Sequence, residues 1–189
     1  MPALDGCTAF GALPQSLYTT GNVFYVDSGT GNDRYVGDDP KSPKATMVSA
    51  MDNCTANHGD IIYLMPGHTE EVPGDDFTLD TAGVSIIGIR QGARGPTFNG
   101  GGSGAMISLD ASSIRLSNII WNLEGTATTT NVGIDITANG DGCIVDNCLF
   151  LPHATSQFTD MIQVSGAAAD ICIVDNQCFS LESGAGATS

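Results

Sequence analysis

Basic residues are scarce in this sequence. Its 189 residues include 6 Lys+Arg against 21 Asp+Glu, and the formal net charge is −15. A chain this acidic is repelled by the phosphates of nucleic acids and by anionic membrane surfaces. We therefore expect neither nucleic acid nor a membrane as a partner. The charge suits a soluble particle or a partner that presents a basic face.

Long apolar runs and paired cysteines are also missing. No apolar run approaches the roughly 20 residues that cross a membrane. The opening MPALDGCTAF lacks the basic and then apolar regions of a secretion signal. The six cysteines form no C-x-x-C pair, which argues against a zinc site. We interpret the cysteines as small buried apolar residues and expect no cofactor.

What the sequence does contain is a repeated segment. CIVDNCLF at 143–150 returns as CIVDNQCF at 172–179, which is 29 residues later. The same spacing leads back to residue 118, and a further 30 residues back lies Gly88. Self-similarity near a fixed period, with short β-rich runs broken by Gly, Asn and Ser, is typical of a solenoid. The alignment places like residues in two columns: Asn118, Asn147 and Asn176 in one, and Trp121, Phe150 and Phe179 in the other.

These repeats predict an all-β fold. Each repeat holds two or three alternating runs of three to five residues, too short for a helix and typical of strands. In a coiled chain, like strands stack in parallel sheets about 4.8 Å apart. The asparagine column is expected to pass hydrogen bonds from coil to coil at a tight turn, because Asn tolerates left-handed backbone angles. The aromatic column is expected to stack in the interior.

Residues 22–72 carry a second pattern. Tyr25-Val26-Asp27 is followed by a loop rich in Gly, Asn and Asp, then by a predicted helix over 45–57, then by GDIIYLMPG at 59–67. This order resembles the opening segment of pectate-lyase-like right-handed parallel β-helix proteins. The helix has an apolar-leaning face that could cap the first coil, formed by Thr46, Val48, Met51 and Cys54.

The resemblance covers roughly residues 22–181. It implies a short right-handed parallel β-helix of about four or five coils, preceded by an arm (1–21) and followed by a tail (182–189). It is specific for the fold and not for the function, because the same solenoid serves lyases, hydrolases, bacteriophage tailspikes and non-enzymatic virion proteins.

The resemblance also implies where catalysis could occur. Lyases of this fold use an Arg or Lys base on the outer face, together with Ca²⁺ held by acidic residues. Arg115 is the best candidate base, and Asp80 with Asp110 aligns in adjacent coils about 5 Å apart, where the pair could hold a cation or share a proton. The simpler interpretation makes both aspartates turn residues and Arg115 a solvated strand residue. No second basic residue accompanies Arg115, so we leave enzymatic activity open and lean against it.

Two further groups of outward residues stand out. Asp146 and Asp175 are expected to stack, which could form a weak Ca²⁺ site. Apolar residues are expected in two neighbouring outward columns, and they would form either a subunit interface or a surface covered by loops 124–131 and 152–160. These apolar residues are Ile120, Ile144, Leu149, Ile173 and Cys178.

The leading functional hypothesis is a structural one. We expect a virion protein that is assembled in the host cytoplasm, of the bacteriophage capsid decoration or cement type. It would form a trimer and bind a major capsid protein or another virion protein through residues 1–21. One alternative is a polysaccharide lyase or tailspike-type depolymerase that uses Arg115, Asp80 and Asp110. The other is a non-catalytic module that binds a glycan.

Overall fold

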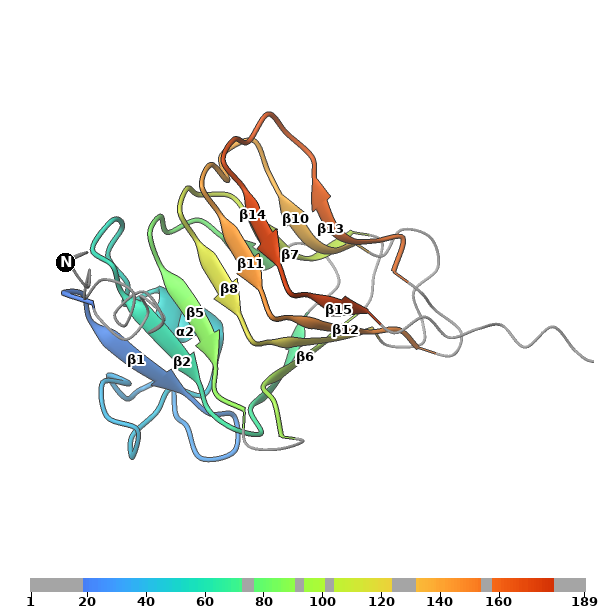
Figure 1. Cartoon of the computed structure of the whole chain (residues 1–189). Coiled ribbons are helices and arrows are strands. Elements are labelled where there is room, and N and C mark those ends of the chain that lie inside the picture. Colours follow the sequence, from blue (N-terminus) through green and yellow to red (C-terminus); the bar gives the residue numbers. More distant parts are fainter. Residues whose placement is uncertain are drawn as a thin grey trace, which may run out of the picture.

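A computed structural model describes residues 19–72, 77–90, 94–100, 104–123, 132–153 and 158–178. These residues form three parallel β-sheets wound into one solenoid (Figure 1). The described part of the chain contains no helix long and apolar enough to cross a membrane.

The three sheets contain six, five and four strands. The first sheet consists of β1 (Val23–Val26), β2 (Ile61–Leu64), β5 (Ser85–Gly88), β8 (Arg115–Ser117), β11 (Ile144–Asp146) and β14 (Cys172–Val174). The second consists of β3 (Thr69–Val72), β6 (Thr97–Gly100), β9 (Ile120–Leu123), β12 (Leu149–Leu151) and β15 (Gln177–Cys178). The third consists of β4 (Phe77–Leu79), β7 (Ala105–Leu109), β10 (Val132–Ile136) and β13 (Asp160–Val164).

The chain visits the sheets in turn. β2-β3-β4, β5-β6-β7, β8-β9-β10 and β11-β12-β13 are successive coils, and β14-β15 begins the next one within the described residues. Every strand pairs in parallel with its counterpart in the neighbouring coil. The prediction of a short right-handed parallel β-helix is confirmed.

Aromatic rings fill the interior behind the second sheet. Trp121 and Phe150 occupy one inner column and have no exposed surface. The column starts one coil earlier than predicted, because Phe98 stacks on Trp121 with ring centroids 5.2 Å apart. Phe158 packs edge-on against Phe150 at 5.6 Å. Residue 179 lies outside the described residues.

The cap helix is shorter than predicted. α2 spans Met47–Met51 instead of 45–57, and it lies beside β1 and β2 at one end of the solenoid (Figure 1). Thr46 caps its start by accepting a hydrogen bond from the Ser49 N–H. The helix ends early because the Thr55 N–H donates to the Asp60 carboxylate, which draws the Asn- and Asp-rich segment into turns. Its buried face is Met47, Ala50 and Met51, whereas Val48 is 44% exposed.

The asparagine column connects the coils at the turn after the first sheet. Asn118 and Asn147 both have left-handed backbones, with φ of 62° and 54°. The Asn147 side chain donates to the Asn118 side-chain oxygen at 3.3 Å, and Asn118 donates to the Gly88 carbonyl at 2.5 Å. A Cβ on Gly88 would lie 2.2 Å from the Asn118 carbonyl oxygen, so the close approach requires glycine there.

The last described coil departs from the predicted register by one residue. Ile144 pairs with Cys172, a spacing of 28 residues, whereas the repeat predicts 29. Asp175 therefore takes the left-handed position, with φ of 54°, that the repeat assigns to Asn176. The Asn176 side chain instead bonds to the previous coil, where it donates to Val145 and accepts from the Cys148 N–H. Because β14 is exposed, no buried face holds this strand in the repeat's register.

Candidate functional site

Arg115 lies on the outer face of the first sheet, between two buried neighbours in sequence, Ile114 and Leu116. Its Nε and Nη2 atoms each lie 2.9 Å from a different oxygen of the Asp146 carboxylate. The Ser117 hydroxyl donates to the same carboxylate at 3.0 Å. The result is a bidentate ion pair between adjacent coils, and both side chains are about one fifth to one quarter exposed.

This ion pair works against the predicted role of Arg115 as a base. The hydrogen bond to Asp146 raises the pKa of the Arg115 guanidinium above its usual value. A base must first lose its proton, and the neighbouring carboxylate stabilises the protonated form. In this arrangement the guanidinium is a hydrogen-bond donor and a positive charge.

Asp146 and Asp175, which the sequence predicts to stack, do not form a pair. Asp146 pairs with Val174 on β14, and Asp175 lies in the turn beyond. The predicted stack of Asp146 on Asp175 is therefore wrong, because of the one-residue shift in the last coil. Among the described residues no group of three or more His, Cys, Asp or Glu side chains is placed to hold a metal ion.

Asp80 and Asp110 follow paired strands in adjacent coils, as their alignment predicts, since Leu79 pairs with Leu109. The Asp110 carboxylate accepts hydrogen bonds from the Thr137 hydroxyl at 2.5 Å and from the Asn139 amide at 2.9 Å. These two bonds lower the pKa of Asp110. Asp110 thus stabilises the turn after β10 in the next coil. Arg115 forms its ion pair with Asp146 and with neither Asp80 nor Asp110.

The outward apolar columns are smaller than predicted. Ile120 and Leu149 are neighbours on the outer face of the second sheet, whereas Ile144 on the first sheet lies between Arg115 and Cys172. The shifted register moves the other two residues to inner columns: Ile173 pairs with Val145, and Cys178 pairs with Phe150. The role of these residues in an interface stays a prediction.

A polar strip on the outer face of the second sheet escaped the sequence analysis. The Asn99 amide donates to the Glu71 carboxylate at 2.9 Å, and the Asn122 amide donates to the Asn99 side-chain oxygen at 2.9 Å. Thr69 and Thr97 pair beside them on the same face. We call these five residues the amide strip. Each of its Glu and Asn residues is the third residue of its strand, but loops of unequal length separate the strands, so no constant spacing reveals the pattern.

Comparison with known proteins gives one informative similarity. No family model matches the sequence, and no curated protein matches it. A solved structure of a rhamnogalacturonan lyase is similar, with a TM-score of 0.54 and 15% sequence identity. The similarity covers 84% of this chain and 52% of that chain, so this chain spans about half the length of the lyase.

At this level of identity the similarity shows the fold alone. The shared architecture is the parallel β-helix, and it agrees with the resemblance carried by residues 22–72. The chain has the fold of a pectate-lyase-like right-handed parallel β-helix.

Proposed function

We propose that the protein binds a polysaccharide along the amide strip on the outer face of its second sheet. The hydrogen-bonded row of Glu71, Asn99 and Asn122 carries this proposal. Amide groups donate and accept hydrogen bonds and carboxylates accept them, so both can pair with sugar hydroxyls. A row that continues from coil to coil suits a chain-like ligand, because solenoids offer extended binding surfaces.

The fold similarity to a rhamnogalacturonan lyase supports a polysaccharide ligand by analogy. The alternative function is cleavage of the polysaccharide, with Arg115 as the base and Asp80 and Asp110 as ligands of Ca²⁺. We favour binding, because the bond to Asp146 stabilises the protonated form of Arg115, which cannot act as a base.

The test is affinity electrophoresis through gels that contain neutral or acidic polysaccharides. We expect at least one polysaccharide to retard the protein, and the double variant Asn99→Ala, Asn122→Ala to lose most of that retardation. Gln163→Ala is the control, because Gln163 is exposed on the third sheet and pairs with Asp135. Retardation that persists in the double variant contradicts the proposed face.

The same polysaccharides test cleavage. Incubation with Ca²⁺, followed by ultraviolet detection of the unsaturated product of lyase action, separates an enzyme from a binding module. Product formed by the parent and lost in Arg115→Ala would favour the lyase hypothesis over the binding module.

A second candidate is a structural role in a virion, as a trimer bound to capsid protein. Four large apolar side chains on the last two described coils favour assembly with another protein: Met161 and Val164 on β13, and Ile173 and Val174 on β14, are 39% to 47% exposed. The native mass measured across a dilution series tests this role. A trimer that persists on dilution supports it, and a monomer at every concentration contradicts self-assembly.

A further inference from the structure

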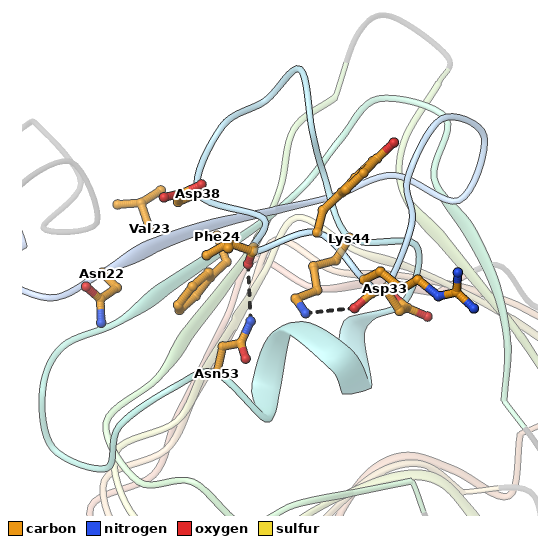
Figure 2. A pocket seen from close by; sticks show the side chains of 10 residues that line it. Asn22, Val23, Phe24, Asp33, Asp38, Lys44 and Asn53 are labelled. Carbon is orange, nitrogen blue, oxygen red and sulfur yellow. Dashed lines mark hydrogen bonds between the residues drawn. The ribbon is translucent and has the colours of Figure 1, made fainter.

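A pocket of about 570 Å³ lies between β1, the loop that follows it and the segment after α2 (Figure 2). Its volume falls in the range of about 300–1,000 Å³ typical of small-molecule sites. It is separate from the amide strip, since it contains no residue of the second sheet. The lining residues are Asn22, Val23, Phe24, Asp33, Arg34, Tyr35, Val36, Asp38, Lys44 and Asn53.

Lys44 is a buried cation in this lining. It is 6% exposed, and its backbone is held along the edge of β1. The Lys44 N–H donates to Tyr25 and its carbonyl accepts from Asp27, both at 2.9 Å. Gly37 has φ of 85° and makes room for the lysine stem, since a Cβ there would lie 2.7 Å from the Lys44 Cγ. These contacts fix the backbone and the start of the stem of Lys44.

The ammonium group of Lys44 has little compensation for its charge. It donates to the Asp33 carbonyl oxygen at 3.1 Å, which Figure 2 shows as a dashed line. The Asp33 carboxylate points elsewhere, because it accepts hydrogen bonds from the N–H groups of Ala45 and Thr46 and from the Thr46 hydroxyl. Lys44 forms no ion pair with any described residue. A buried cation in this state is costly unless an anion joins it.

The other lining groups match a hydroxylated ligand. Asn22 and Asn53 bring amides that donate and accept hydrogen bonds, and Figure 2 shows Asn53 approaching from the helix side. The Asn53 amide is held in place by a bond to the Val36 carbonyl at 3.1 Å. Phe24 supplies an apolar wall, and Tyr35 is a 44% exposed aromatic ring in the same lining. An apolar face between amides suits a sugar ring.

We propose that this pocket binds a small polyhydroxylated carboxylic acid, with its carboxylate on the Lys44 ammonium and its hydroxyls on Asn22 and Asn53. The carboxylate supplies the counter-charge that Lys44 lacks. Arg34 brings a second positive charge to the same lining and Asp38 a negative one, while the Asp33 carboxylate is bonded to Ala45 and Thr46. The proposal does not depend on polysaccharide binding by the amide strip.

Isothermal titration of the full chain with D-glucuronate tests this site, and D-glucose is the uncharged comparison. We expect saturable binding of glucuronate, with glucose at least tenfold weaker. Lys44→Met keeps the apolar stem and removes the charge, and should weaken glucuronate binding at least tenfold. Lys41→Met is the matched control, because Lys41 is an exposed lysine in the same loop, and it should stay within about twofold of the parent.

Tyr35→Ala provides a second variant, since Tyr35 is exposed and its loss should leave the fold intact. We expect it to weaken glucuronate binding several-fold even if Lys44→Met fails to fold. The proposal is overturned if the parent shows no saturable binding of glucuronate, or if a folded Lys44→Met variant binds it as the parent does.

Discussion

At the scale of single residues, Asp60 connects the start of the solenoid. Its side chain has no exposed surface and accepts hydrogen bonds from the Asn22 N–H at 2.6 Å, the Thr55 N–H at 2.7 Å and His58 Nδ1 at 2.7 Å. Burial alone would raise the pKa of Asp60, but the bonds from Thr55, His58 and Asn22 outweigh it and the pKa is lowered. One carboxylate thus joins the residue before β1, the turn after α2 and the start of β2.

Asp60→Asn should therefore destabilise the protein by about 2 kcal/mol at neutral pH, because one amide oxygen cannot replace a carboxylate that accepts three bonds. Urea unfolding measures the difference, and Asp52→Asn, at an exposed position at the end of α2, should change stability little. The folded pKa lies below the unfolded value of about 3.9, so this stability is present above that pH and lost as pH falls below it. The difference in the free energy of unfolding between the parent and Asp60→Asn should therefore become smaller at low pH.

The ion pair between Arg115 and Asp146 makes a second prediction at this scale. A double-mutant cycle of Arg115→Ala and Asp146→Ala should give a coupling free energy of about 0.5–1 kcal/mol, because both side chains are partly exposed. Unfolding in urea at low salt measures it, and added salt should reduce it. A coupling near zero would mean that the pair is not formed in solution.

At the scale of elements, turns with left-handed residues flank the strands of the first sheet. Left-handed residues follow the first sheet at Asn118, Asn147 and Asp175, and a second left-handed column precedes it. Both columns recur from coil to coil, so the turns set the spacing of the repeat. The second column comprises Gly59, Gly83, Ser113, Gly142 and Asp170.

Asn118 allows the two contributions of such a turn to be separated. Asn118→Gly removes its bond to Gly88 and keeps the left-handed backbone accessible. Asn118→Ala removes the same bond and adds a left-handed penalty of about 1–2 kcal/mol. We expect the alanine variant to be less stable than the glycine variant by about 1 kcal/mol in urea unfolding. Equal stabilities would show that the backbone angle matters little.

The sequence predicted the elements best where a buried face specifies their register. The repeat spacing holds between β8 and β11 and between β9 and β12, where Trp121 and Phe150 are fully buried. It fails at β14, where every residue is exposed and Asn176 reaches back to the previous coil. The cap helix was overextended, because the sequence pattern does not reveal that Asp60 accepts the Thr55 N–H.

The candidate site was less predictable than the fold. The outward position of Arg115 follows from strand alternation, but its partner Asp146 depends on the register between coils. The amide strip depends on loops whose lengths vary. The sequence spacing between Glu71 and Asn99 therefore differs from that between Asn99 and Asn122. Spatial neighbours on a solenoid are set by the coil, and sequence periodicity reveals them only where the coils are equal in length.

At the scale of the whole molecule, the two ends of the described solenoid differ. α2 packs against β1 and β2 at one end, while β13, β14 and β15 at the other end are largely exposed (Figure 1). A hollow of about 410 Å³ opens there, lined by Phe150, Ile162 and Ile173 among others. Protection from solvent therefore falls along the solenoid axis towards the last coil.

Thiol labelling should follow this gradient. Cys172 and Cys178 are exposed, whereas Cys143 and Cys148 are buried. Burial raises the pKa of the Cys148 thiol to about 11, so little reactive thiolate is present near neutral pH. We expect iodoacetamide to modify Cys172 and Cys178 in the native protein well before Cys143 and Cys148, as measured by peptide mass spectrometry. Equal rates would contradict an exposed last coil.

The aromatic column gives the molecule an optical property as well as a core. Trp121 is the single tryptophan of the chain, and it lies fully buried against Phe98 in the middle of the solenoid. Its fluorescence therefore reports the solvent exposure of one central coil. Loosening of the last coil would leave the emission unchanged, whereas global unfolding would shift it to longer wavelength. The protein thus distinguishes fraying from unfolding without an added label.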